Sequence, residues 1–395
     1  MKKILVASAC VAALSGCILE DDKKNPESFD SLADQIAVIA TPASDYSSGS
    51  HAIIDTMNYE NFQLGLLPTV SDMTVASYGE YFYRIERFGA DNITKFHISE
   101  PSIPVWQFTT LGQGEVNSGN PHDMVFIDEN NAVLLRHAKQ TSWIVNPTAQ
   151  SDVEFKQGEL DFSAYAVDSV GGESPNATSG VVVGNKLFVV MQRLDVSWTP
   201  QQAYVAVFDT ATMTEIDTGF VGDTVNGIPL TISNPSKIQY SSDTGLIYVQ
   251  GLNYGDYSSG IETINPSTYA HNLLVDDNDV VDGGIGKISS FTVVSASKGY
   301  LVSYEGWEDN GVYSFNPTTG DIDTTPIDGS LKNIAIDDIA VDREGMVWIS
   351  NRTSLGMSVI DSADNSIVNS NISTQLPPSR IVFVDKPAVV AEITP

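Results

Sequence analysis

The sequence predicts an all-β fold, a seven-bladed β-propeller whose ring is closed by both ends of the chain. The first observation is a repeated pattern between residues 117 and 210, in which a polar turn is followed by three short apolar strands. The second is that the segment ending the third strand recurs seven times, at intervals of 44 to 63 residues. Four-stranded units of about 40–50 residues are typical of propeller blades. This even spacing disfavours the alternative fold, a pair of β-sandwiches.

The seven units follow one another from residue 35 onward. Their third strands are SHAIIDT (50–56), NITKFHIS (92–99), TSWIVNP (141–147), VAVFDT (205–210), GIETINP (260–266), GVYSFNP (311–317) and MSVIDS (357–362). A second apolar strand precedes each of them. The Asp, Asn, Thr and Pro residues after the third strand are turn formers, so we expect them to lead into an outer fourth strand, such as 324–328 or 366–372.

The two ends of the repeat pattern indicate how the ring closes. The pattern begins partway through a blade, with the second strand QIAVIAT (35–41), and it finishes with PSRIVFVD (378–385), which resembles the missing first strand. A ring joined in this way leaves no exposed edge strand. We therefore assign residues 35–395 to one propeller domain, in which residues 388–394 are a candidate for one further strand.

Composition excludes several classes of protein. The chain has 395 residues, of which 42% are apolar, so it can bury a large core. Its formal net charge of −30 repels phosphate backbones, which makes nucleic acid a poor partner. The only cysteines are Cys10 and Cys17, and Cys10 lies in the expected signal segment, so neither a disulfide nor a cysteine metal site is predicted.

Residues 1–17 have the pattern of a targeting segment. Lys2 and Lys3 precede an apolar stretch, and the segment ends in Leu-Ser-Gly-Cys at Cys17. This ending resembles the lipobox of bacterial lipoproteins, and the resemblance implies cleavage before Cys17 and acylation of that residue. Ile18 in the next position implies sorting to the outer membrane. Residues 18–34 are polar and would form a tether, while an ordinary secretory peptide is the alternative.

Three motifs carry a further resemblance. They are NPHD (120–123), MQRLD (191–195) followed by Trp198-Thr199-Pro200, and AVFDTAT (206–212). These motifs resemble segments of bacterial secreted propeller lipoproteins of the YVTN-repeat, quinoprotein-like group. The resemblance implies the fold and the location. Some related surface lipoproteins lie over TonB-dependent transporters and capture cobalamin or siderophores. The tryptophan-docking patterns of quinone-dependent dehydrogenases are absent, so no cofactor is predicted.

Cations and aromatic residues concentrate in one class of loop. The loops after the second strands emerge on one face of a propeller, and Arg and aromatic side chains often anchor recognition. The candidate binding residues at these positions are Arg84, Arg87, Arg136, Gln192, Arg193, Trp198, Tyr254, Tyr304, Trp307 and Arg352, and the same loops carry Tyr46, Phe88, His137 and Tyr257. The alternative is that each Arg pairs locally, with acids such as Glu86, Asp195 and Asp309.

His122 and Asp123 begin a first strand on the same face, near the axis. His122 is a candidate general base or metal ligand, as in propeller lyases and lactonases, while its sequence context favours the alternative that it caps a turn and lines the channel. Asp277, Asp279 and Asp282 offer hard oxygen ligands, but the glutamate that completes a calcium loop is missing, so a solvated acidic turn is the alternative. The chain contains no nucleophile elbow, zinc-protease helix motif or phosphate-binding loop.

These observations favour non-catalytic binding on the loop face. The ligand would be a small anionic or aromatic molecule, or the partner would be a protein such as a TonB-dependent transporter. A propeller lyase or lactonase with a channel site near His122 is the first alternative, and a scaffold in envelope assembly is the second. The predicted link to the membrane is the lipid on Cys17.

Overall fold

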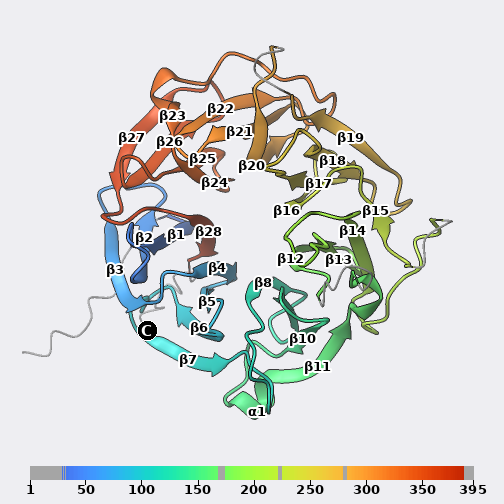
Figure 1. The fold of residues 1–395 in the computed structure, drawn as a ribbon. Helices are drawn as coiled ribbons and strands as arrows, with labels where there is room; N and C mark the ends of the chain where they lie inside the picture. Colours follow the sequence, from blue (N-terminus) through green and yellow to red (C-terminus); the bar gives the residue numbers. More distant parts are fainter. Residues whose placement is uncertain are drawn as a thin grey trace, which may run out of the picture.

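The computed structural model describes Phe29, Ser31 and residues 33–167, 174–220, 225–278 and 283–386. Within these residues the chain forms seven four-stranded sheets around a central axis (Figure 1). The predicted seven-bladed propeller is therefore confirmed. The predicted signal segment 1–17, most of the tether and the candidate strand at 388–394 lie outside the described residues.

Each blade runs from an inner strand at the axis to an outer strand at the rim. The first three blades are β28 (Arg380–Asp385), β1 (Gln35–Pro42), β2 (Gly49–Asp55), β3 (Phe62–Thr69); β4 (Met73–Tyr78), β5 (Tyr81–Glu86), β6 (Asn92–His97), β7 (Pro104–Thr109); and β8 (Pro121–Phe126), β9 (Ala132–Arg136), β10 (Thr141–Val145), β11 (Lys156–Asp161). The short helix α1 (Asp152–Phe155) precedes β11, and a 3₁₀ turn, η1 (Ser163–Tyr165), follows it.

The other four blades repeat this arrangement. They are β12 (Ala177–Val183), β13 (Lys186–Met191), β14 (Tyr204–Asp209), β15 (Ile228–Pro229); β16 (Pro235–Ser241), β17 (Leu246–Gly251), β18 (Gly260–Ile264), β19 (His271–Asp276); β20 (Lys287–Ser295), β21 (Lys298–Gly306), β22 (Asp309–Phe315), β23 (Lys332–Ile334); and β24 (Ile336–Val341), β25 (Met346–Asn351), β26 (Gly356–Asp361), β27 (Ile367–Ser373). A second 3₁₀ turn, η4 (Gly329–Leu331), precedes β23.

The closure of the ring follows the prediction. β28, from the end of the described chain, pairs antiparallel with β1, so that Val384 lies opposite Ile36 and Ile381 lies opposite Ile39. All four side chains are buried. The sequence PSRIVFVD is thus the first strand of the blade that QIAVIAT begins.

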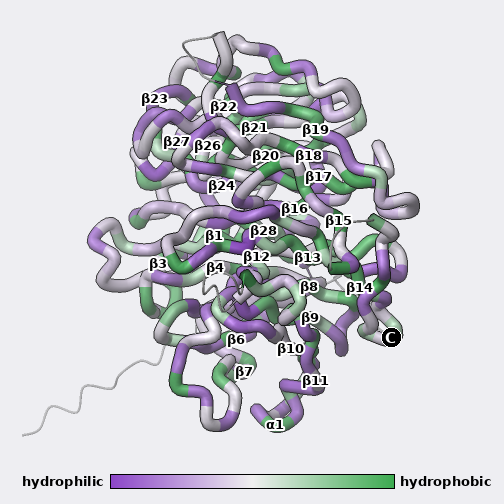
Figure 2. Tube along the Cα trace, turned by 45° about the vertical axis from the view of Figure 1, so that its right-hand side comes forward, coloured by the Kyte–Doolittle hydropathy of each residue, from purple (hydrophilic) through white to green (hydrophobic). Residues whose placement is uncertain are grey.

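The core lies between the blades. One apolar cluster joins Val38 and Ile53 of the first blade to Val75, Phe82 and Phe96 of the second, and similar clusters fill the other interfaces. The middle strands are buried on both faces, so their sequences are short continuous apolar runs. The outer strands alternate between exposed and part-buried residues, and Figure 2 shows this contrast between hydrophobic stretches of β13 and β17 and the hydrophilic β11.

The expected outer strand at 324–328 is wrong. These residues touch β22 only at separate points, such as the bond from the Ile327 amide to the Val312 carbonyl, and the fourth strand of that blade is β23. Pro326 has no N–H for a ladder bond, and the Thr325 amide turns back to the Asp323 side chain. The other expected outer strand, 366–372, corresponds to β27.

Candidate functional site

Two of the predicted binding arginines lie inside the protein. The Arg84 side chain is 2% exposed, and its guanidinium donates to Glu86 Oε1 (3.0 Å) and to the Leu67 carbonyl (2.6 Å). The Arg136 side chain is 1% exposed, pairs with Glu115 and lies 4.5 Å from the centre of the Trp143 ring. Both guanidinium groups are used within the fold, so these two residues are corrected from the loop face to the interior.

Arg193 and Arg352 are also held by protein groups. Arg193 donates to the carbonyls of Tyr165 (2.7 Å) and Gln202 (2.8 Å), which ties down the loop that follows β13. Arg352 pairs with Asp337 and packs 5.0 Å from the centre of the Trp307 ring. These arginines therefore bond to local protein groups, which was the alternative to a shared cationic face. Neither Asp195 nor Asp309 is the partner.

Arg87 and the polar ends of several inner strands surround a cavity on the axis. The cavity has a volume of about 250 Å³. Its lining comprises Thr74, Arg87, His122, Asp123, Thr178, Ser179, Gln192, Ser236 and Arg380. We call it the axial cavity. Three predicted residues near the axis, His122, Asp123 and Gln192, are thus brought together here, and Arg87 joins them.

The two cations of the axial cavity differ in how firmly they are paired. Arg87 donates from Nε to Asp72 Oδ1 at 2.7 Å. Arg380 lies 3.7 Å from Asp338, beyond hydrogen-bond distance, and its side chain makes no hydrogen bond within the described part of the chain. The Arg380 side chain is also 35% exposed. Its guanidinium is therefore the cation with donors to spare.

His122 stacks on His137 at the wall of the axial cavity. The two rings are 4.2 Å apart at an angle of 14°, and His137 Nε2 lies 3.0 Å from Gln192 Oε1. Burial lowers the pKa of His122 well below its ordinary value, and the charge on His137 lowers it further. Burial also lowers the pKa of His137. Both imidazoles are therefore neutral at physiological pH.

Asp123 is held beside this pair by the next inner strand. Its carboxylate accepts hydrogen bonds from Ser179 Oγ (3.1 Å) and the Gly180 amide (3.3 Å) of β12. Burial raises the pKa of Asp123, while the charge of Arg380 opposes that rise. The Asp123 carboxyl group therefore joins β8 to β12, and it is close enough to Arg380 to feel the charge of that guanidinium.

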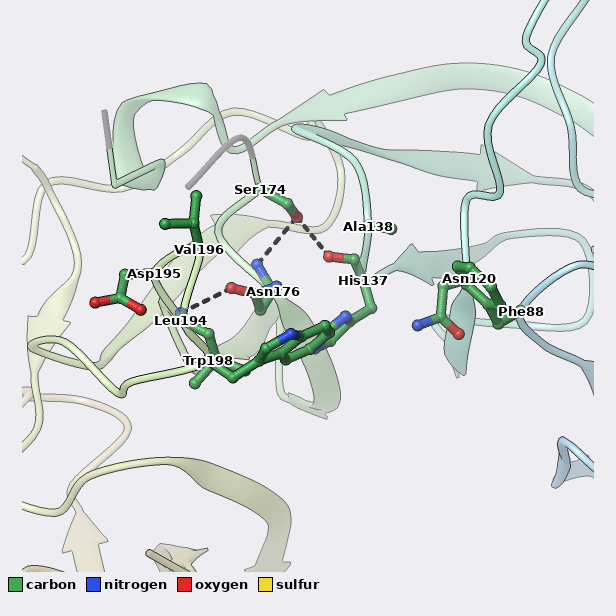
Figure 3. Close-up of a pocket in the computed structure, with 10 residues that line it drawn as sticks. All are labelled: Phe88, Asn120, His137, Ala138, Ser174, Asn176, Leu194, Asp195, Val196 and Trp198. Carbon is green, nitrogen blue, oxygen red and sulfur yellow. Dashed lines mark hydrogen bonds between the residues drawn. The ribbon is translucent and has the colours of Figure 1, made fainter. Parts of the chain in front are cut away.

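A second cavity opens on the loop face beside the first. It has a volume of about 460 Å³ and we call it the outer pocket (Figure 3). Its lining comprises Phe88, Asn120, His137, Ala138, Ser174, Asn176, Leu194, Asp195, Val196 and Trp198. The axial cavity and the outer pocket share a wall, because His137 lines the one and its stacking partner His122 lines the other.

The remaining predicted aromatics lie with a different part of the face. Tyr254 and Tyr304 form an edge-to-face pair with ring centres 5.5 Å apart, and Trp307 lines a smaller cavity with Arg352 and Tyr46. None of these five residues lines the axial cavity or the outer pocket. The predicted binding residues therefore form two separate groups and not one continuous surface.

The weak metal candidate is only partly described. Asp277 is buried and accepts a hydrogen bond from the Ser259 amide at 3.0 Å, whereas Asp279 and Asp282 lie outside the described residues. Burial raises the pKa of Asp277 to about 6. In the described ranges no three His, Cys, Asp or Glu side chains gather in a group that suits a metal ion. Those ranges also contain no helix long and apolar enough to cross a membrane.

Sequence reasoning missed Arg380 and the asparagines of the outer pocket. Arg380 is the first residue of the closing strand β28. A polar residue at the start of an inner strand was the signal that identified His122, and the same signal was available for Arg380. Asn120 and Asn176 occupy equivalent places before β8 and β12, and both have a left-handed backbone with φ of 47° and 59°. Their shared position in the repeat could have identified them.

No family model matches the chain, and no curated protein matches it by sequence. Among solved structures, a putative 6-phosphogluconolactonase from Bacteroides fragilis is 12% identical with a TM-score of 0.61, covering 89% of this chain and 98% of its own. A similar protein from Bacteroides uniformis has the same identity and TM-score, covering 89% and 100%. The periplasmic gluconolactonase PpgL of Pseudomonas aeruginosa is 14% identical with a TM-score of 0.56, also covering 89% and 100%. At this identity the similarity shows the fold alone.

Proposed function

We propose that the protein binds a small molecule through an anionic group held in the axial cavity. The observation that carries the proposal is Arg380, a guanidinium without a hydrogen bond in the described chain, which lines a polar cavity of about 250 Å³. A guanidinium presents a planar fork of donors that matches a carboxylate or a phosphate. The ligand would supply the acceptors that the fold does not.

The surroundings of Arg380 suit such a ligand. Thr74, Thr178 and Ser236 add hydroxyl groups from three other inner strands, and Gln192 adds an amide. Ligand sites generally combine a concave shape with a few convergent polar groups. A ligand bound here would contact several blades at once.

Titration calorimetry with succinate, gluconate and inorganic phosphate tests the proposal. At least one of these anions should bind the wild-type protein, and Arg380→Ala should weaken that binding by about tenfold or more, because hydrogen bonds to charged groups contribute about 1.5–3 kcal/mol. Arg343→Ala is the matched control, since Arg343 is exposed and pairs with Asp385 outside the cavity. Equal losses in both variants would contradict the proposal.

Lactone hydrolysis is a second candidate for the same cavity. The observation that favours it is neutral His122 beside Asp123 and opposite Arg380. His122 would take a proton from water as the water adds to the lactone carbonyl. Arg380 would stabilise the developing oxyanion. The ring C–O bond would then break as His122 returns the proton to the leaving ring oxygen, which gives a hydroxy acid. The three similar structures carry lactonase names, which supports a test but assigns no activity to this chain.

A direct assay separates the two candidates. Acid release from gluconolactone, measured in a pH-stat, should exceed the spontaneous rate with the wild-type protein and return to it with His122→Ala. If gluconate binds and no lactone is hydrolysed above the spontaneous rate, the protein is a binding protein only.

We further propose that the propeller is a lipoprotein of the YVTN-repeat group, held at the outer membrane through Cys17. The lipobox-like ending of residues 1–17 supports this location, and the polar segment after it would allow the propeller to stand away from the lipid. In that setting the loop face would be open either to a diffusing ligand or to a membrane protein such as a TonB-dependent transporter. A role as an assembly scaffold would use the same anchor.

A further inference from the structure

We infer that the outer pocket is a second, separate site that binds a neutral saccharide unit. The proposal concerns a different cavity from the anion site and does not depend on it. It rests on three features of the pocket: two exposed aromatic rings, uncharged hydrogen-bonding groups between them, and a rigid frame.

The aromatic rings are Phe88 and Trp198. They come from blades on different sides of the pocket, after β5 and β13, and they are 69% and 71% exposed. Two exposed aromatic side chains that line one pocket offer an apolar surface to a ligand, and their flat faces suit the C–H face of a sugar ring. Together they give the pocket two apolar surfaces open to solvent.

Apart from Asp195, whose carboxylate accepts hydrogen bonds from Ser197, Thr199 and Gln201 of its own loop, the groups between the rings are donors and acceptors without charge. Asn176 Oδ1 accepts a hydrogen bond from the Leu194 amide, which leaves the Asn176 Nδ2 amine with no partner in the described chain. Figure 3 shows the Asn120 amide nitrogen directed toward His137 and Trp198, while Asn120 Oδ1 is buried without a partner. His137 donates from Nε2 to Gln192 in one tautomer, which leaves Nδ1 as an acceptor.

This combination excludes the simpler ligand classes. None of the described residues that line the pocket is Arg or Lys, so an anion finds no counter-charge. A purely apolar ligand would cover the amides of Asn120 and Asn176 without bonding to them, which costs about 1–3 kcal/mol for each such group. A ring with an apolar face and hydroxyl groups at its edge satisfies both the aromatics and the amides.

The frame of the pocket is held in place by the protein. Asp195 Oδ1 accepts from the amides of Ser197 (2.8 Å) and Thr199 (3.0 Å), on either side of Trp198. Trp198 has a left-handed backbone with φ of 62°, which is uncommon for a bulky residue. Arg193 bonds to two carbonyls at the base of this loop. The backbone that carries Trp198 is thereby held in place before any ligand arrives.

Saturation-transfer NMR and calorimetry with glucose, galactose, mannose, maltose and cellobiose test the inference. At least one sugar should receive saturation at its ring protons and bind with a measurable Kd. Trp198→Ala should raise that Kd by about tenfold, through loss of the stacking surface. Asn176→Asp keeps the Oδ1 acceptor for the Leu194 amide and replaces the free donor by a second, negatively charged acceptor, so it should also weaken binding.

Two controls make the result specific. Trp307→Ala removes another exposed tryptophan, 55% exposed and outside the pocket, and should leave the Kd unchanged. Arg380→Ala should also leave it unchanged, so failure of the anion site and failure of this site are distinguishable. The inference is overturned if no sugar binds, if Trp307→Ala weakens binding as much as Trp198→Ala, or if indole binds the pocket and sugars do not. Melting of each variant verifies that it is folded.

Discussion

Asp338 connects four blades at the axis, so its replacement should strongly destabilise the propeller. Its carboxylate, on β24, accepts from Lys237 Nζ on β16 (2.7 Å), from Ser290 Oγ on β20 (3.2 Å) and from the Ile381 amide on β28 (3.1 Å). Lys237 also donates to the Ile339 carbonyl at 2.7 Å. The buried carboxylate thus ties the closing strand to three other blades.

We expect Asp338→Asn to lower the free energy of unfolding by about 3–5 kcal/mol. Removing one partner of a buried ion pair leaves the other charge uncompensated, here the Lys237 ammonium. The loss of one partner usually costs about 3–5 kcal/mol. The loss would be a large fraction of the stability of a typical domain, about 5–15 kcal/mol. The double variant Lys237→Met, Asp338→Asn removes the stranded charge and should recover part of the loss.

The same carboxylate gives the stability a predictable pH dependence. Burial alone would raise the pKa of Asp338, but Lys237, Arg380 and the hydrogen bonds together hold the pKa below its ordinary value. A group with a lowered pKa in the folded state contributes stability above its unfolded pKa, near 3.9, and that contribution is lost as the pH falls through the folded value. Wild-type stability should therefore fall more steeply in acid than that of the double variant.

Urea unfolding monitored by tryptophan fluorescence, at pH 7 and at a series of acidic pH values, provides the measurement. A loss below about 1 kcal/mol for Asp338→Asn at pH 7, with an unchanged denaturant slope, would refute the idea that this carboxylate holds the ring together. A double variant less stable than the single one would show that the charge on Lys237 is not the cause.

Three further outcomes are expected. Cys17→Ser should move the protein from the membrane fraction to the soluble fraction, since each buried methylene of an acyl chain contributes about 0.8 kcal/mol; equal fractionation would contradict a lipid anchor. Deleting residues 378–395 removes β28 and exposes the edge of β1, so size-exclusion chromatography should show aggregation, and a monomer with unchanged melting would argue against closure by this strand. Arg136→Ala should lower the free energy of unfolding by about 1–3 kcal/mol, because it removes the buried guanidinium that pairs with Glu115. Replacing the exposed Arg343 by Ala should change it by less than about 0.5 kcal/mol. Comparable melting of the two variants would contradict a stabilising role of Arg136 inside the fold.

The repeat pattern predicted the fold because it reflects burial. The middle strands of each blade are covered on both faces, so they contain continuous apolar runs such as IAVIA (36–40), whose spacing can be counted. The closing strand was predictable for the same reason, since Ile381 and Val384 pack into the core. The outer strand at 324–328 was not, because an edge strand needs little burial and leaves a weak signal in the sequence.

The binding residues were predicted less well, because position in the repeat does not determine where a long side chain ends. Arg136 is the last residue of β9 and Arg84 lies two residues before the end of β5, yet both turn inward, to Glu115 and Glu86 respectively. His122 lies near the axis, as expected, because its backbone is near the start of the inner strand β8.

The distribution of charge explains why Arg380 is available to a ligand at the axis. The chain uses most of its few arginines to join its own blades and loops, as Arg84, Arg136 and Arg193 illustrate. A cation used in this way has no donors left for a ligand. Arg380 differs because the carboxylate nearest to it, Asp338, is already taken by Lys237 and by backbone amides. The same structural tie that closes the ring therefore leaves one guanidinium available at the axis, and loss of Asp338 should disturb both stability and anion binding.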